Sequence, residues 1–162
     1  MGMTPKEFFE SFVEGNLEDC RENPGSVRRA FNAAISASHL ADQWYTFNLR
    51  HNPLLVTGFK EIGQFVEYLS KETSGAFRDV RSIANAYKHL YTDVDSLYGK
   101  HSVIDSSGAI DLVEIDDSEL VRAEKEYGGS SSKVVFTRRD GSTLDFLPVL
   151  EKVVAYWRDT IK

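Results

Sequence analysis

The 162-residue chain has one cysteine, Cys20, so it can form neither an intrachain disulfide nor a cysteine-based zinc site. It has no apolar run as long as a secretory signal or a membrane span. Basic side chains are the minority, with 19 Lys and Arg against 25 Asp and Glu and a net charge of -6. This balance disfavours broad, non-specific binding to nucleic acid. We therefore expect a cytoplasmic, reduced protein that does not enter a membrane.

Common chemical motifs are missing as well. The sequence has no Walker loop, no GxGxxG and no nucleophile elbow, which removes the usual support for nucleotide-binding and hydrolase classes. It has no HExxH and no paired Glu-x-x-His pattern. We therefore expect no metal ion and no cofactor.

Helical signals fill the first 90 residues. Thr4, Pro5 and Glu7 form a capping-box pattern that begins a helix, and Pro24 and Gly25 end it near residue 22. Apolar residues at helical spacing predict further helices at about 26–50, about 59–72 and from about 76 onward. Short connections between them favour antiparallel neighbours and hence a bundle.

From about residue 99 the apolar spacing changes. Segments 109–115 and 120–127 have strand-like composition or alternation, although 120–127 also fits a helix. Segment 133–146 predicts a hairpin with Asp140-Gly141 as a two-residue turn. That turn pairs Thr137 with Leu144 and Val135 with Phe146, and it makes "RRDGS" at 138–142 the polar tip of the hairpin.

A last helix opens at Pro148. The fold prediction is a mainly α protein: an antiparallel bundle of about five helices, with a small antiparallel sheet at about 102–147 before the last helix. It forms one domain over 1–162. Trp44 and Trp157 lie on apolar stripes, so we expect both to be largely buried.

The helix that contains "FRDVRSIANAYKHL" has a polar edge. Arg81, Asn85 and His89 recur every four residues, and Lys88 lies beside them. An arginine can hold a phosphate and a histidine can transfer protons near neutral pH, which would suit phosphodiester chemistry. The alternative is a solvated edge of an amphipathic helix.

A second polar group, His39 and Asp42, lies on the helix at about 26–50. The two residues are three apart, so the carboxylate could orient the imidazole. If this helix and the one with Arg81 are neighbours, the two polar groups meet across a groove. Structural hydrogen bonding between the helices is the alternative to catalysis.

Three segments, "AISASHLADQWY", "IANAYKHL" and "VVAYWRDTI", resemble in order those of uncharacterised bacterial helical proteins that look like the HEPN class. That class includes metal-independent ribonucleases of toxin–antitoxin and phage-defence systems, usually dimeric, and many non-catalytic members. Its motif is an arginine, a polar residue and then a histidine after four to six intervening residues. Arg81, Ser82 and His89 are similar to it, but seven residues separate the arginine from the histidine.

Two functions follow from the residues and the resemblance. The resemblance implies a ribonuclease or RNA-binding protein, in which Arg81 and His89 are catalytic and Asn85, Lys88, His39 and Asp42 bind. The stretched spacing and the acidic balance favour instead a non-catalytic interaction module, for which the class implies a homodimer or a partner protein.

Overall fold

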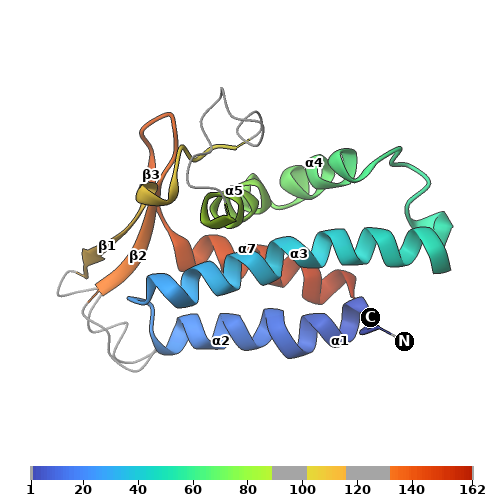
Figure 1. The fold of residues 1–162 in the computed structure, drawn as a ribbon, viewed down its shortest axis with the longest axis horizontal. Helices are drawn as coiled ribbons and strands as arrows, with labels where there is room; N and C mark the ends of the chain where they lie inside the picture. The colour runs from blue at the N-terminus through green and yellow to red at the C-terminus, as the bar shows by residue number, and fades with distance from the viewer. Residues whose placement is uncertain (1, 89–101, 116–131, 162) are drawn as a thin grey trace.

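The computed structural model describes residues 2–88, 102–115 and 132–161. Its first helices, its longest helix and its last helix lie alongside one another, and a small sheet covers one end of them (Figure 1). The elements, in chain order, are α1 (Pro5–Phe8), the π-helical η1 (Phe9–Val13), α2 (Glu14–Glu22), α3 (Val27–His51), η2 (Pro53–Leu55), α4 (Ile62–Glu72), α5 (Ala76–Lys88), η3 (Ser107–Ala109), β1 (Ile110–Glu114), β2 (Ser132–Thr137), β3 (Thr143–Asp145) and α7 (Phe146–Thr160).

Side-chain caps fix where the helices begin. The predicted capping box is present: Thr4 Oγ1 accepts the Glu7 amide proton at 3.2 Å, and Glu7 Oε2 accepts the Thr4 amide proton at 2.8 Å. Ser26 caps α3 by accepting the Arg29 amide proton at 3.3 Å. The predicted bounds of the first two helical segments are therefore confirmed to within a residue or two.

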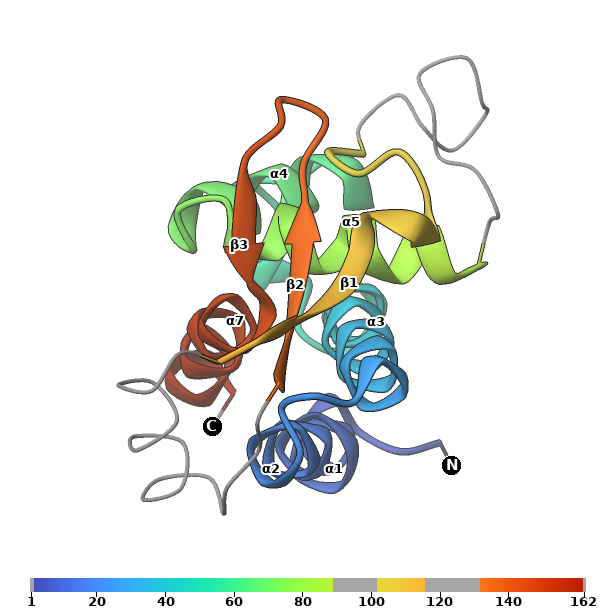
Figure 2. The same cartoon turned by 90° about the vertical axis from the view of Figure 1, so that its left-hand side faces the viewer.

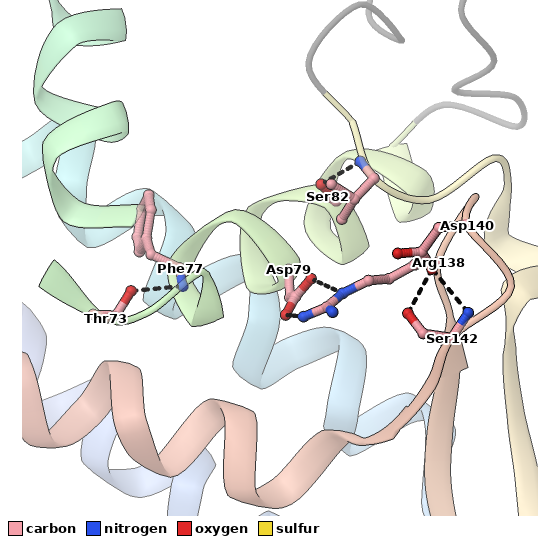
Figure 3. Close-up of polar contacts among 8 residues, drawn as sticks. Thr73, Phe77, Asp79, Ser82, Arg138, Asp140 and Ser142 are labelled. Carbon is pink, nitrogen blue, oxygen red and sulfur yellow. Dashed lines mark hydrogen bonds and ion pairs between the residues drawn. The ribbon is translucent and has the colours of Figure 1, made fainter. Parts of the chain in front are cut away.

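One threonine serves both helices of the α4–α5 turn. Thr73 Oγ1 donates to the carbonyl of Leu69 at 2.8 Å. It also accepts the Phe77 amide proton at 2.9 Å (Figure 3). Gly75, with φ of +88°, lets the chain change direction between the helices at little conformational cost. This turn sets the direction in which α5 leaves α4.

The sheet has the order β1-β2-β3, with both pairs antiparallel. The hairpin is present, but its predicted register is wrong by one residue: Thr137 faces Thr143, and Leu144 faces Phe136. The loop is longer than two residues because the Arg138 amide donates to Ser142 O at 2.8 Å. Gly141, with φ of +87°, supplies the left-handed residue that a bulged three-residue loop requires. Phe146 does not pair in the hairpin; it begins α7.

The sheet packs onto the helices and shares their core. Figure 2 shows β2 in the middle of the sheet, across the ends at which α3 and α7 begin. Val134 and Phe136 of β2 join the main hydrophobic cluster, whereas Val135 is buried outside it. Among the described residues, the largest fully buried side chains are Trp157, Phe65, Phe77, Phe136, Leu17, Leu40, Leu69, Ile83, Ile104 and Leu150.

Small residues let α3 sit at the centre of the bundle. Most of its buried positions are alanine or serine, which allow neighbouring helices to approach closely. Trp157 of α7 is 0% exposed, as predicted. Trp44 is also mostly buried, as predicted: its ring stacks on Phe65 at 5.0 Å, and only part of its surface stays outside the core.

The predicted fold class is confirmed: a mainly helical protein with a three-stranded antiparallel sheet before the last helix. The strand-like segment 120–127 lies outside the described residues. No helix in the described parts of the chain is both long and apolar enough to cross a membrane.

Candidate functional site at the α3–α5 seam

The polar residues of α5 occupy one narrow arc of the helix. Arg78, Arg81, Asn85 and Lys88 fall within about 80° of one another, on the side away from the buried residues of α5. His89, the predicted proton-transfer residue, lies outside the described residues. Four cationic or amide side chains therefore point outward from a helix whose opposite face is core.

Arg81 and Asp42 form an ion pair that joins α5 to α3. Arg81 Nη1 lies 3.3 Å from Asp42 Oδ2, and Arg81 Nη2 lies 3.4 Å from Asp42 Oδ1. The Ser38 hydroxyl accepts a third hydrogen bond from Nη1 at 3.4 Å. Both charged side chains keep part of their surface in solvent, 28% for Arg81 and 39% for Asp42. The two predicted polar groups therefore meet across the helices, through this pair.

Asp42 is the carboxylate that sequence reasoning assigned to His39, but the structure gives it a different partner. The His39 ring packs edge-on against Phe8, with centroids 5.7 Å apart, and its side chain is exposed. Within the described chain, no hydrogen bond joins His39 to Asp42 or to Arg81. The orientation of His39 comes from an aromatic neighbour.

Two grooves lie on either side of the ion pair. One, of about 420 Å³, runs between α4 and α5 and includes Arg81, Asn85 and Ser82 in its lining. The other, of about 450 Å³, lies along α3 beneath the N-terminal segment and includes His39 and Asp42. Of the candidate binding residues, Asn85 lines the first groove and His39 and Asp42 line the second, whereas Lys88 is exposed and lines neither. Each groove contains one member of the ion pair.

A second ion pair was missed by sequence reasoning. Arg138 Nε donates to Asp79 Oδ1 at 2.9 Å, and Arg138 Nη2 donates to Asp79 Oδ2 at 2.6 Å (Figure 3). Asp79 is nearly buried, with 3% of its side chain exposed. Its hydrogen bonds, the largest cause, raise the pKa of the Arg138 guanidinium. The interpretation of 138–142 as merely a polar hairpin tip is wrong, because Arg138 anchors that tip to α5.

The rest of the tip is held locally. Asp140 Oδ1 accepts the amide proton of Ser142 at 2.8 Å as well as a bond from its hydroxyl, and these bonds lower the pKa of the Asp140 carboxyl (Figure 3). The Ser82 hydroxyl of α5 accepts the Val103 amide proton at 3.1 Å. The α5 helix therefore holds both the hairpin tip and the segment that leads to β1.

No described element covers one face of α3, which lies between α1 on one side and α5 on the other. Phe8 meets His39 at one edge, and the Tyr87 ring meets Phe31 at the other, with centroids 5.0 Å apart. Tyr87 is 58% exposed, because this edge contact covers only part of its ring. We call this surface the open α3 face; its exposed or half-buried α3 residues are Arg28, Phe31, Asn32, Ile35, His39, Asp42 and Thr46.

Comparisons with protein-family models, with curated proteins and with solved structures give no match. Among residues 2–88, 102–115 and 132–161, no three His, Cys, Asp or Glu side chains gather in an arrangement that could hold a metal ion. What the site can do must therefore be argued from its side chains alone.

Proposed function

We propose that the chain is a non-catalytic, HEPN-like interaction module that pairs with a second copy of itself through the open α3 face. One observation carries the proposal: Arg81, the residue that would hold a scissile phosphate, is already bound through both terminal nitrogens to Asp42. An incoming phosphate would have to displace a carboxylate from its partner and would then lie against that negative charge. The ion pair is better suited to joining two helices than to phosphodiester cleavage.

The order of residues on the open α3 face supports a two-fold pairing. If two copies pack antiparallel with Ile35 at the symmetry axis, residue i of one copy lies opposite residue 70 − i of the other. Arg28 then faces Asp42, Phe31 faces His39, and Ile35 faces its own copy. The pairing therefore places a positive side chain opposite a negative one and an aromatic ring opposite an imidazole ring.

Arg28 and Asp42 both have capacity for this contact. Arg28 is exposed and has no hydrogen-bond or ion-pair partner among the described residues. Asp42 keeps 39% of its side chain exposed while it binds Arg81, and a carboxylate can accept from more than one donor. In the dimer, Asp42 would bridge Arg81 of its own chain and Arg28 of the partner chain.

The open α3 face is large and aromatic enough for the task. The helix has 25 residues and is therefore about 37 Å long. A stable interface needs about 800 Å² from each partner and is enriched in aromatic side chains. Phe12 and Tyr87, which are 46% and 58% exposed, flank the face and would add to the buried area.

Sedimentation velocity on the full chain tests the pairing. We expect a dimer for the wild type, a monomer for Ile35→Asp, and weakened association for Arg28→Glu, which places an acid opposite Asp42. The matched control is Lys152→Glu, which makes the same charge change on the exposed side of α7 and should leave the dimer intact. A monomeric wild type contradicts the proposal, as does a dimer that Ile35→Asp leaves unchanged.

Cleavage of single-stranded RNA tests the catalytic alternative implied by the resemblance. We expect no metal-independent cleavage by the wild type. We also expect Arg81→Ala to lower stability by about 1 kcal/mol, in keeping with a partly exposed pair. Wild-type cleavage that Arg81→Ala abolishes, with stability unchanged, would establish the ribonuclease instead.

A further inference from the structure

We infer that the groove between α4 and α5 binds a small zwitterion of the amino-acid type, with its carboxylate on α5 and its ammonium group on α4. The groove volume of about 420 Å³ lies within the range of small-molecule sites, about 300–1,000 Å³. This inference does not rest on the proposed dimer, because the groove lies on the α4 side of Arg81 and the open α3 face lies on the other.

The α5 wall supplies hydrogen-bond donors that nothing in the described chain uses. Arg78 and Asn85 are seven residues apart and so lie on one side of the helix, with Arg81 between them. Among the described residues, neither the Arg78 guanidinium nor the Asn85 amide has a hydrogen-bond or ion-pair partner. An arginine fork and an amide together match the two oxygens of a carboxylate.

The α4 wall has the opposite charge. Glu61 precedes α4 and Glu67 lies within it; both are exposed, and both line the groove. Neither carboxylate lies within 4.0 Å of a basic nitrogen in the described chain, so Arg78 does not close an ion pair across the groove. The two charged walls are therefore held apart.

This separation decides the class of ligand. A phosphate or a simple dianion would gain from Arg78 but would be repelled by Glu61 and Glu67, and a simple amine would meet the reverse difficulty. A molecule with one negative and one positive end satisfies both walls. At the base of the groove, Ser82 uses its oxygen to accept the Val103 amide proton, so its own hydroxyl proton is available to a ligand oxygen.

Isothermal titration calorimetry of the full chain with a graded series of ω-amino acids tests the inference. The probes are glycine, β-alanine, 4-aminobutyrate, 5-aminopentanoate and 6-aminohexanoate, with hexanoate and hexylamine as single-charge controls. We expect one chain length to bind best and both single-charge controls to bind at least about tenfold more weakly than it. Hexanoate or hexylamine binding as tightly as the best amino acid overturns the inference, and so does the failure of every amino acid to bind.

Substitutions then place the site. We expect Arg78→Gln and Glu67→Gln each to weaken binding of the best ligand by at least about tenfold. Each substitution removes the protein charge that contacts one end of the ligand. Both residues are exposed, so the variants should fold, which circular dichroism checks. Lys152→Gln on α7 is the matched control and should bind as the wild type does. Unchanged affinity in Arg78→Gln overturns the assignment of this groove.

Discussion

Asp79 and Arg138 lie 59 residues apart in the sequence, yet they join through two parallel hydrogen bonds of 2.9 Å and 2.6 Å. The carboxylate belongs to α5 and the guanidinium to the loop between β2 and β3. Asp79 is nearly buried, and among the described residues Arg138 is the one cation that balances its charge. The pair fixes the hairpin to the helical bundle.

We predict that Arg138→Ala lowers the free energy of unfolding by about 3 kcal/mol, because it leaves the Asp79 carboxylate buried without a cation. Chemical denaturation measures the change. Arg158→Ala is the control: it breaks an exposed ion pair with Glu14 and should cost no more than about 1 kcal/mol. Pairing Arg138→Ala with Asp79→Asn should restore part of the loss. A double variant no more stable than Arg138→Ala would argue against the buried charge as its cause.

Trp157 should be the most sensitive aromatic position. Its side chain is fully buried against Phe65 and Trp44, so Trp157→Ala should cost about 3–5 kcal/mol through the cavity it leaves. Trp157→Phe should cost far less, because the indole nitrogen has no hydrogen-bond partner among the described residues and none is lost. Thermal unfolding of the two variants compares them. Equal destabilisation would mean that the indole N–H has an acceptor.

The buried Cys20 thiol should make the folded protein less stable at alkaline pH. Burial, the largest cause, raises the pKa of its thiol from 9.0 to about 12. Because the pKa is raised, the folded protein keeps the thiol proton to a higher pH than the unfolded chain does. The contribution of the protonated Cys20 thiol to folding stability is therefore fully present below pH 9 and is lost between pH 9 and 12. By pH 10 the loss should be about 1.4 kcal/mol.

Urea unfolding of the wild type and of Cys20→Ala, at pH 8 and at pH 10, isolates this contribution. Cys20→Ala should be less stable at pH 8 but should lose less of its stability between the two values. Parallel losses in the two proteins would show that the thiol does not contribute. Native Cys20 should also react with iodoacetamide far more slowly than the unfolded chain does, because it is buried.

Thr73 offers a test of the α4–α5 turn. Thr73→Val keeps the shape but removes both hydroxyl bonds, to Leu69 and to Phe77, and should cost about 1–2 kcal/mol. Thr73→Ser keeps the hydroxyl and should cost less, which differential scanning calorimetry can compare. If Thr73→Ser is less stable than Thr73→Val, packing of the threonine methyl group contributes more than the two hydroxyl hydrogen bonds do.

Local signals predicted most of the helices and the strands. Capping residues and apolar spacing are properties of neighbouring residues, and they placed the starts of α1 and α3 and the bounds of β1 and β2 closely. The hairpin register failed because Asp-Gly serves both a two-residue turn and a bulged loop. The folded backbone distinguishes the two: Asp140 lacks the positive φ that a two-residue type I′ turn needs, and the Arg138 amide donates to Ser142 O.

The candidate site was predictable only in part. The meeting of Arg81 with Asp42 followed from two polar faces on neighbouring helices, but Asp42 paired with the arginine and not with His39. No pattern in the sequence around Arg138 indicates that its side chain pairs with Asp79. One signal was present at Asp79, an acid on the same side of the helix as Val80 and Ile83, which indicates a buried charge that needs a distant cation.

The placement of α7 determines when the chain can finish folding on the ribosome. Leu150, Val153, Val154 and Trp157 complete the centre of the protein, and α7 also pairs with the first helices through Arg21–Glu151 and Arg158–Glu14. These contacts span more than a hundred positions, so the apolar sides of the preceding segments stay uncovered until α7 has emerged from the ribosome. The speed at which the α7 segment is translated, and chaperone access before it emerges, therefore bear directly on the yield of native protein.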